Sequence, residues 1–126
     1  MKYKVAIFTT SRAEFGIFYP LLRQLIMDED TEPVLFVGGA HLALEYGKTI
    51  EEINDLDIYV SDTFDYLLNG DDSYSMAKSF AIANYELARI FENHKFDFTC
   101  ILGDRFELLA VVSNSIVFKV PICVGN

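Results

Sequence analysis

The chain has 126 residues, of which 52% are hydrophobic and 14% aromatic, which suits one domain with a buried core and excludes intrinsic disorder. Its formal net charge of −9 argues against nucleic acid and against an anionic membrane surface as partners, since both need a basic face. A phosphate ligand is compatible with this charge, because local arginines and helix N-termini govern phosphate binding. No membrane-spanning apolar run and no signal-peptide pattern occur, so a cytoplasmic protein is expected.

Apolar strands and amphipathic helices are predicted to alternate along the chain. Strands are expected at residues 4–9, 33–37, 58–60, 98–102 and 121–124. Helices are expected around residues 17–26, 49–54, 73–91 and 107–118, with Pro20 tolerated only near the first turn of the first helix. Residues 61–72 are acidic and rich in turn-forming types, which indicates an exposed loop. The alternation predicts an α/β fold, a doubly wound parallel sheet with strand order 3-2-1-4-5.

The predicted core includes one face of the 73–91 helix and both cysteines. The buried face of this helix is expected to carry Met76, Phe80, Ala83, Leu87 and Ile90. Cys100 and Cys123 fall in strands that are predicted to be buried, and they lack CxxC spacing. They are therefore expected to be reduced core thiols, not a disulfide or a metal pair.

The last predicted strand ends immediately before Gly125 and Asn126. A doubly wound sheet needs cover on both faces, and a helix normally follows such a strand. We therefore expect residues 1–126 to form one domain that belongs to a longer chain.

Three charged residues follow the fourth predicted strand. Gly103 permits a tight exit from the strand, and Asp104, Arg105 and Glu107 come next. The carboxyl ends of parallel strands face the ligand crevice, where a carboxylate can move protons and a guanidinium can hold phosphate or carboxylate. The same spacing fits a helix capping box, and Glu107 is expected to be a helix-start residue. On the residues alone, a ligand site and a helix cap both stay open.

The loop after the first predicted strand is a candidate phosphate site. Thr9, Thr10 and Ser11 supply hydroxyls and Arg12 supplies a guanidinium, at a helix N-terminus whose amides and dipole favour anions. Neither a dinucleotide-binding glycine fingerprint nor a P-loop is present. Alternatively, Thr10 or Ser11 only caps the helix, and Arg12 pairs with Glu14 at the surface.

Three sequence blocks lie in register with those of a known family. The blocks are Thr10-Ser11-Arg12-Ala13-Glu14-Phe15-Gly16, then Gly39-Ala40-His41-Leu42 with Glu45-Tyr46-Gly47-Lys48-Thr49 and Glu52-Ile53, and finally Gly103-Asp104-Arg105-Phe106-Glu107-Leu108-Leu109-Ala110. Together they resemble the hydrolysing UDP-N-acetylglucosamine 2-epimerases of sialic- and nonulosonic-acid biosynthesis. The sequence departs from the family pattern at Gly38, where relatives often carry a hydroxyl, and at its last three residues, where a histidine and Gly-Gly-Glu usually follow.

The resemblance implies a fold and a reaction. The fold would be the Rossmann-like N-terminal half of a two-domain GT-B fold, whose second half supplies most of the uridine pocket. The reaction would convert UDP-N-acetylglucosamine or a diacetamido analogue, through a 2-acetamidoglucal, to UDP and the 2-epimeric free sugar. The resemblance implies no cofactor and no metal, a UDP-sugar as the ligand, and a homo-oligomer when the protein is full length. The 126-residue chain alone is expected to be inactive.

The resemblance also assigns roles to individual residues. Asp104 matches a carboxylate required for the chemistry at sugar C2 and is the expected catalytic residue. Arg12 matches the arginine near the diphosphate, with Ser11 beside it as a further UDP-binding residue. Arg105 matches a residue that binds or orients ligand. His41 matches a family histidine, although a hydrogen bond that braces its loop is the alternative.

Other function classes fit parts of the pattern. A flavodoxin-like FMN domain would use the hydroxyl-rich loop for phosphate and Tyr66 or Tyr74 for stacking on the flavin. A noncatalytic nucleotide-sugar binding module would use the same loops without turnover. A response-regulator receiver domain is disfavoured, because the first strand ends in threonines and a serine where an acidic pair is needed, and no lysine follows Val124.

Overall fold

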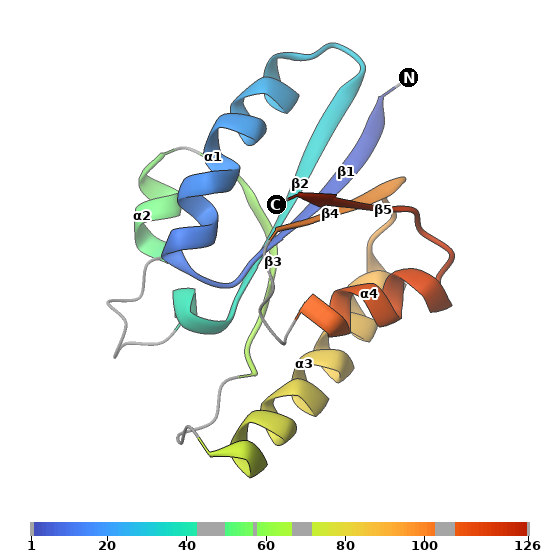
Figure 1. Ribbon diagram of the computed structural model, residues 1–126. Coiled ribbons are helices and arrows are strands. Elements are labelled where there is room, and N and C mark those ends of the chain that lie inside the picture. The colour runs from blue at the N-terminus through green and yellow to red at the C-terminus, as the bar shows by residue number, and fades with distance from the viewer. Residues whose placement is uncertain (1, 43–49, 57, 67–71, 103–107, 126) are drawn as a thin grey trace.

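The computed structural model describes residues 2–42, 50–56, 58–66, 72–102 and 108–125 (Figure 1). In chain order the elements are β1 (Tyr3–Thr9), α1 (Arg12–Met27), β2 (Thr31–Gly38), the 3-10 helix η1 (Gly39–Leu42), α2 (Ile50–Asp55), β3 (Val60–Phe64), α3 (Ser73–Asn93), β4 (Phe98–Leu102), α4 (Leu108–Val117) and β5 (Ile122–Gly125). None of the described helices is long and apolar enough to cross a bilayer.

The five strands form one parallel sheet in the order β3-β2-β1-β4-β5, which confirms the predicted topology. The central strand β1 pairs with β2 along its whole length, from Tyr3 opposite Thr31 to Thr9 opposite Val37. On its other side β1 pairs with β4, where Val5 lies opposite Phe98. Because β1 and β4 are parallel neighbours, their carboxyl ends lie side by side, at the switch point where doubly wound sheets bind ligands.

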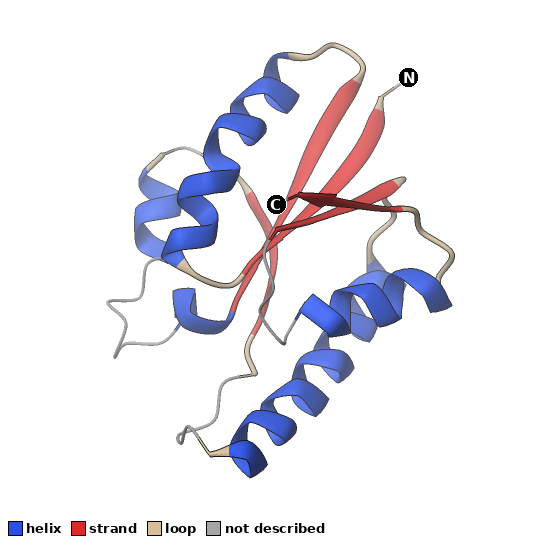
Figure 2. Cartoon of the chain, in the orientation of Figure 1, coloured by secondary structure: helices blue, strands red, loops and turns tan. Residues whose placement is uncertain are grey.

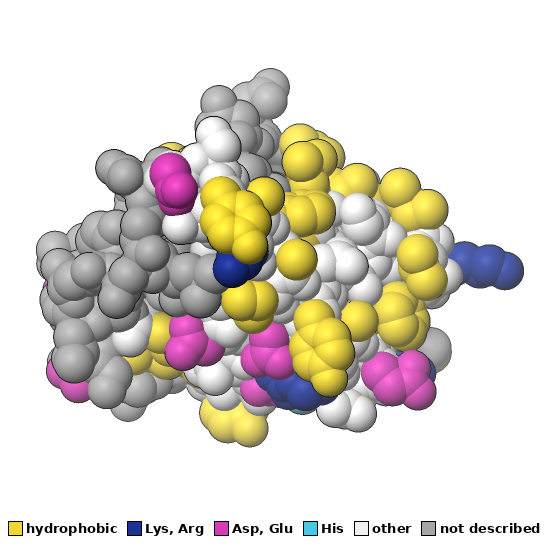
Figure 3. Space-filling view, turned by 90° about the horizontal axis from the view of Figure 1, so that it is seen from below, with side chains coloured by type: hydrophobic (Ala, Val, Ile, Leu, Met, Phe, Trp, Pro, Cys, Tyr) yellow, Lys and Arg dark blue, Asp and Glu magenta, His cyan; other side chains and the backbone are white. Residues whose placement is uncertain are grey.

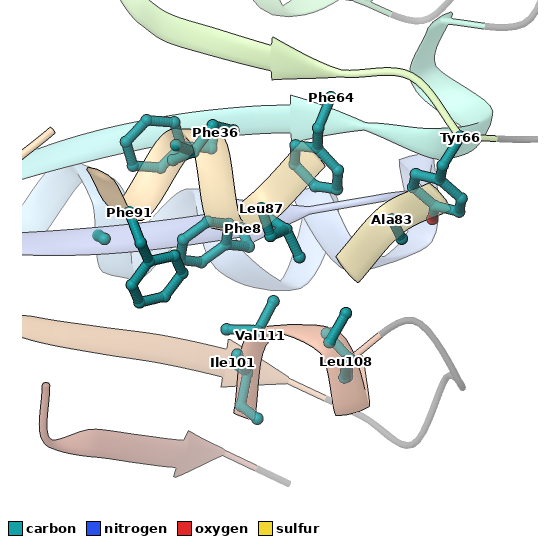
Figure 4. Close-up of a cluster of buried hydrophobic side chains, with 13 residues drawn as sticks. Phe8, Phe36, Phe64, Tyr66, Ala83, Leu87, Phe91, Ile101, Leu108 and Val111 are labelled. Atoms are coloured by element: carbon teal, nitrogen blue, oxygen red, sulfur yellow. The ribbon is translucent and has the colours of Figure 1, made fainter. Parts of the chain in front are cut away.

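Helices cover both faces of the sheet: α1 and α2 lie on one face, and α3 and α4 on the other (Figure 2). The core under α3 and α4 is built largely from aromatic rings (Figure 4). At its centre Phe8 stacks on Phe36 and Phe91, with ring centroids 5.1 and 5.8 Å away. The core under α1 and α2 is mostly aliphatic, with Ile7 and Leu22 among its buried members. The two layers bury the sheet on both sides, as its apolar strands require.

The third strand differs from its prediction. It was expected at residues 58–60 with an exposed loop after it, but β3 runs from Val60 to Phe64, and both Phe64 and Tyr66 are buried. Asp62 lies inside this strand because its carboxylate is held by Arg89, whose Nη1 donates to Oδ2 over 2.9 Å. An acidic residue is thus accommodated in a strand by a partner from α3.

The position of Pro20 is also different, since it lies well inside α1 and not in the first turn. A proline there removes one helical hydrogen bond and leaves the carbonyl of residue 16 without its usual donor. Both Pro20 and Gly16 are exposed, so water can solvate that carbonyl, which is why the helix continues.

Helix α3 packs on the sheet through most of the predicted face. Ala83, Leu87 and Ile90 are fully buried, as expected. Met76 is 43% exposed, because the first turns of α3 extend beyond the carboxyl ends of the strands (Figure 1). The helix begins with Asp72 as its N-cap, whose Oδ1 accepts the backbone N–H of Ser75 over 3.1 Å.

The last strand, β5, is not buried as predicted. Cys123 and Val124 are both exposed, and Cys100 of β4 is half-buried. In the described part of the chain β5 is an edge strand that pairs only with β4. Neither cysteine is therefore the fully buried core thiol that the sequence predicted, and both thiols are free.

Candidate functional site

The turn that follows β1 is short and leads directly into α1. Thr9 and Thr10 are buried at 0% and 2% exposure, whereas Ser11 is partly exposed. The Thr9 hydroxyl donates to the Ser11 carbonyl over 3.4 Å, and the same carbonyl accepts the Phe15 N–H over 3.0 Å, which starts the helix. Of the three predicted hydroxyls, Ser11 is therefore the one best placed to meet a ligand at the N-terminus of α1.

Arg12 is the first residue of α1 and His41 lies in η1. Their backbones are thus placed after the carboxyl ends of β1 and β2, which are adjacent in the sheet. Their side chains lie outside the described residues, so the expected contacts of both stay predictions.

Two glycines let the end of β2 approach its neighbours closely. A Cβ on Gly38 would lie 2.5 Å from the backbone oxygen of Phe64. Gly39 has φ of +60°, and a Cβ there would lie 2.5 Å from Tyr66 Oη and 3.1 Å from the Thr10 carbonyl oxygen. The glycines are therefore required by close packing of the β1, β2 and β3 ends.

The carboxyl end of β4 also borders the candidate site, because β4 lies next to β1 in the sheet. β4 ends at Leu102 and α4 begins at Leu108, which is buried at 4% exposure and holds the start of that helix in the core. Asp104, Arg105 and Glu107 lie between these points and outside the described residues. The structure thus brings together the strand ends that lead to Arg12, His41 and Asp104, and the choice between a ligand site and a helix cap at Asp104 stays open.

Sequence reasoning missed an ionic cluster between β3 and α3. Asp62 Oδ2 lies 2.9 Å from Arg89 Nη1 and 3.0 Å from His94 Nε2, and Arg89 also donates to the Thr63 carbonyl over 3.0 Å. Burial acts to raise the pKa of Asp62, but hydrogen bonds from His94 and Arg89 outweigh it and hold that pKa below its usual value. The hydrogen bond to Asp62 raises the pKa of Arg89.

This cluster serves to attach α3 to the sheet. The ring of His94 also meets the ring of Phe36 edge-on, with centroids 5.1 Å apart. Asp62 lies 27 residues before Arg89 and 32 before His94, and the three follow no motif, so no sequence signal could have found their pairing. Nowhere in the described residues do three or more histidines, cysteines or carboxylates gather as a metal site requires.

The flavodoxin-like alternative loses one of its supports. Tyr66 is buried and stacks on Phe64, with centroids 5.8 Å apart and ring planes 12° apart. Its ring faces are therefore not open to a flavin. Tyr74 is 67% exposed on α3, where the Lys78 ammonium lies 4.2 Å from its ring centroid.

Comparison with known proteins decides the family. The profile of the family described as UDP-N-acetylglucosamine 2-epimerase matches residues 23–123. The chain belongs to this 2-epimerase family.

Two curated members of the 2-epimerase family illustrate the relationship. The chain is 33% identical over 121 residues to the GDP/UDP-N,N'-diacetylbacillosamine 2-epimerase (hydrolyzing) of Campylobacter jejuni, covering 96% of this chain and 31% of that protein. It is 29% identical over 119 residues to the UDP-N,N'-diacetylbacillosamine 2-epimerase (hydrolyzing) of Legionella pneumophila, covering 94% and 32%. The chain thus spans about a third of the length of these relatives and matches their N-terminal part.

Solved structures share the fold. A crystal structure of a UDP-N-acetylglucosamine 2-epimerase superposes with a TM-score of 0.82 at 16% identity, covering 98% of this chain and 33% of that chain. The Neisseria meningitidis enzyme, solved bound to UDP-GlcNAc, gives a TM-score of 0.73 at 16% identity over 98% of this chain and 32% of that one. The Rossmann-like sheet is therefore that of the N-terminal domain of a GT-B-like 2-epimerase, as predicted.

Proposed function

We propose that the chain is the N-terminal domain of a hydrolysing 2-epimerase that converts a UDP-linked 2-acetamido sugar to UDP and the 2-epimeric free sugar. The identity of 33% to a hydrolysing relative carries this proposal. The adjacent carboxyl ends of β1 and β4 support it, since the residues expected to bind diphosphate and to move the proton follow these two ends. Both relatives above are named for a diacetamido sugar, which favours the diacetamido substrate over plain UDP-N-acetylglucosamine.

The proposed reaction has two steps. A base removes the proton from C2, the bond between C1 and the diphosphate oxygen breaks with its electron pair leaving on UDP, and a C1–C2 double bond forms. Water then adds its hydroxyl to C1, and C2 receives a proton from the opposite face. The C2 proton is weakly acidic and needs a positioned base, and the departing diphosphate needs donors that stabilise its charge.

Each role is assigned to a residue after one of the adjoining strand ends. Asp104 is the proposed base at C2. Arg12, in the first turn of α1, is proposed to hold the diphosphate together with the Ser11 hydroxyl and the amides of the helix N-terminus. Arg105 and His41 are proposed to orient the substrate.

Residues 1–126 form one of two domains in this proposal. The other domain would supply the uridine pocket and the remaining catalytic groups, so the 126-residue chain alone should release no UDP. We further propose that the full-length protein is a homo-oligomer. The side of the molecule built by α3 and α4 supports this, since apolar side chains lie between the charged ones there (Figure 3), and Tyr85, Leu109 and Ile116 are more than half exposed.

Product analysis on the full-length protein tests the proposed function. UDP-N-acetylglucosamine and its diacetamido analogue are supplied separately in D₂O, and products are followed by NMR. The expected result is stoichiometric UDP and a free 2-epimeric sugar with deuterium at C2. A UDP-linked epimer without UDP release would show a non-hydrolysing enzyme, and binding without turnover would show a noncatalytic module; either result contradicts the proposal.

A further inference from the structure

Tyr66 is the polar member of the aromatic core under α3 and α4. It follows β3 by two residues, stacks on Phe64 and is enclosed by the described residues, with an exposure of 2%. The other buried members of this cluster, in the part of the chain that the structure describes, have hydrocarbon side chains. A phenylalanine would fill the core equally well, and burying a hydroxyl costs free energy unless it is hydrogen-bonded. Packing of the core alone therefore does not account for the hydroxyl of Tyr66.

This hydroxyl lies where the strand ends of the candidate site meet. Tyr66 and Leu108 occupy the end of the cluster that is nearest to the carboxyl ends of the strands (Figure 4). A Cβ built on Gly39 would lie 2.5 Å from Tyr66 Oη and 3.1 Å from the Thr10 carbonyl oxygen. The hydroxyl and this carbonyl thus approach Gly39 from the side on which other residues carry their side chain. Tyr66 therefore contacts the end of β2 close to the turn that follows β1.

The backbone on either side of this contact leads to residues that are assigned to the ligand. Gly39 is the first residue of η1, which carries His41, and Thr10 directly precedes Ser11 and the start of α1. Gly39 has φ of +60° and no side chain with which to fill a gap beside it. Without the hydroxyl, η1 is free to settle toward the ring of Tyr66 and away from the turn before α1. Since a misplacement of about 1 Å can cost about 100-fold in rate, this spacing matters for the site.

We propose that Tyr66 is a positioning residue of the UDP-sugar site, which holds the start of η1 and the turn before α1 at the spacing that the diphosphate and the sugar require. This inference rests on the proposed function of the chain. Tyr66 touches no reacting atom in this assignment, because it acts through η1 and through the turn that carries Ser11. Loss of its hydroxyl should therefore weaken ligand binding more than it weakens the fold.

Tyr66→Phe in the full-length protein tests this role, because it removes one oxygen and keeps the ring. The Kd of UDP, measured by calorimetry, should rise at least about fivefold, and kcat/KM for the UDP-sugar that the wild type converts should fall at least about tenfold. The urea midpoint should fall by less than about 1 M, since the packing of the ring is kept. Tyr59→Phe is the matched control: it removes the same atom from a tyrosine that is 81% exposed just before β3, and it should change none of these quantities.

The outcomes separate this inference from the proposed function. If the wild type binds UDP and Tyr66→Phe binds it equally well, the inference is overturned alone, even where the variant is less stable. If the wild type binds UDP without turnover, the proposed function is overturned, and the comparison of UDP affinities decides the inference. A wild-type protein that does not bind UDP would overturn both.

A double-variant cycle tests the contact without any ligand. In Gly39→Ala the new Cβ would meet Tyr66 Oη at 2.5 Å and Cζ at 3.0 Å. Adding Tyr66→Phe removes the closer contact, whereas the strain of an alanine at this positive φ is the same in both backgrounds. Gly39→Ala should therefore lower the urea midpoint by at least about 0.5 M less in the Tyr66→Phe background, and a Gly39→Ala chain that folds only in that background is the same result. Equal losses in both backgrounds would show that the hydroxyl does not lie against Gly39 and would overturn the proposal.

Discussion

Replacing Gly38 by alanine tests the packing that brings the strand ends of the candidate site together. The new Cβ would lie 2.5 Å from the Phe64 ring and 2.5 Å from the Phe64 backbone oxygen. A ring can turn away, but the backbone oxygen belongs to β3, whose register with β2 places Gly38 opposite Phe64. The strain can be relieved only by moving one strand against the other. We therefore expect the free energy of unfolding to fall by about 3 kcal/mol, the upper end of the usual cost of overpacking.

Urea unfolding followed by circular dichroism measures this loss. With an m-value of about 1.5–2 kcal/mol/M, a loss of about 3 kcal/mol lowers the midpoint by about 1.5–2 M. Gly16→Ala is the matched control, because a Cβ there meets nothing within 4 Å and the position is an exposed one inside α1. Alanine should stabilise that helix by about 0.8–1 kcal/mol and raise the midpoint. A Gly38→Ala midpoint within about 0.3 M of wild type would refute the close approach of β2 and β3.

Three further predictions concern charged residues. In the full-length protein, Arg12→Ala should weaken UDP binding by about 1.5–3 kcal/mol, measured by calorimetry, through loss of a charge-assisted hydrogen bond; unchanged affinity would remove Arg12 from the proposed site. Asp104→Asn should cut turnover at least about 100-fold and leave UDP affinity nearly intact, and near-normal turnover would end its assignment as the base. Asp62→Asn should cost the chain about 1–2 kcal/mol at neutral pH, a value reduced by the partial exposure of Arg89. Folding lowers the pKa of Asp62 from 3.8, so its stabilising effect is complete above pH 3.8 and is lost as the pH falls through the folded-state pKa. The unfolding free energies of the wild type and of Asp62→Asn, measured by urea titration, should therefore converge in acid. A difference in unfolding free energy that does not change with pH would contradict the ionic role of Asp62.

The strand order could be predicted because local patterns and general rules of chain connection are enough for it. Short apolar runs alternate with helical periodicity, and right-handed crossovers then leave few topologies. β4 was predicted with its observed bounds, Phe98 to Leu102, since polar Asp97 and a glycine limit the apolar run on either side. The adjacency of the β1 and β4 ends, which defines the candidate site, follows from the same topology.

Features that depend on distant partners could not be predicted. The sequence around Asp62 resembles an exposed loop because the residues that neutralise this carboxylate, Arg89 and His94, come from α3 and the residue after it. Cys100 of β4 lies opposite Cys123 of β5 because of a strand register that no local pattern encodes. The roles assigned to side chains of the site rest on the family resemblance and stay predictions.

The central position of β1 has a consequence for the chain while it is being synthesised. β1, β2 and β3 can pair once Phe64 has left the ribosome, but the other edge of β1 receives its partner only when Phe98 and its neighbours emerge, opposite Val5. Until then an apolar strand presents a row of unpaired N–H and C=O groups, which is a template for pairing with other chains. We therefore expect nascent chains that stop before Phe98 to aggregate or to need a chaperone.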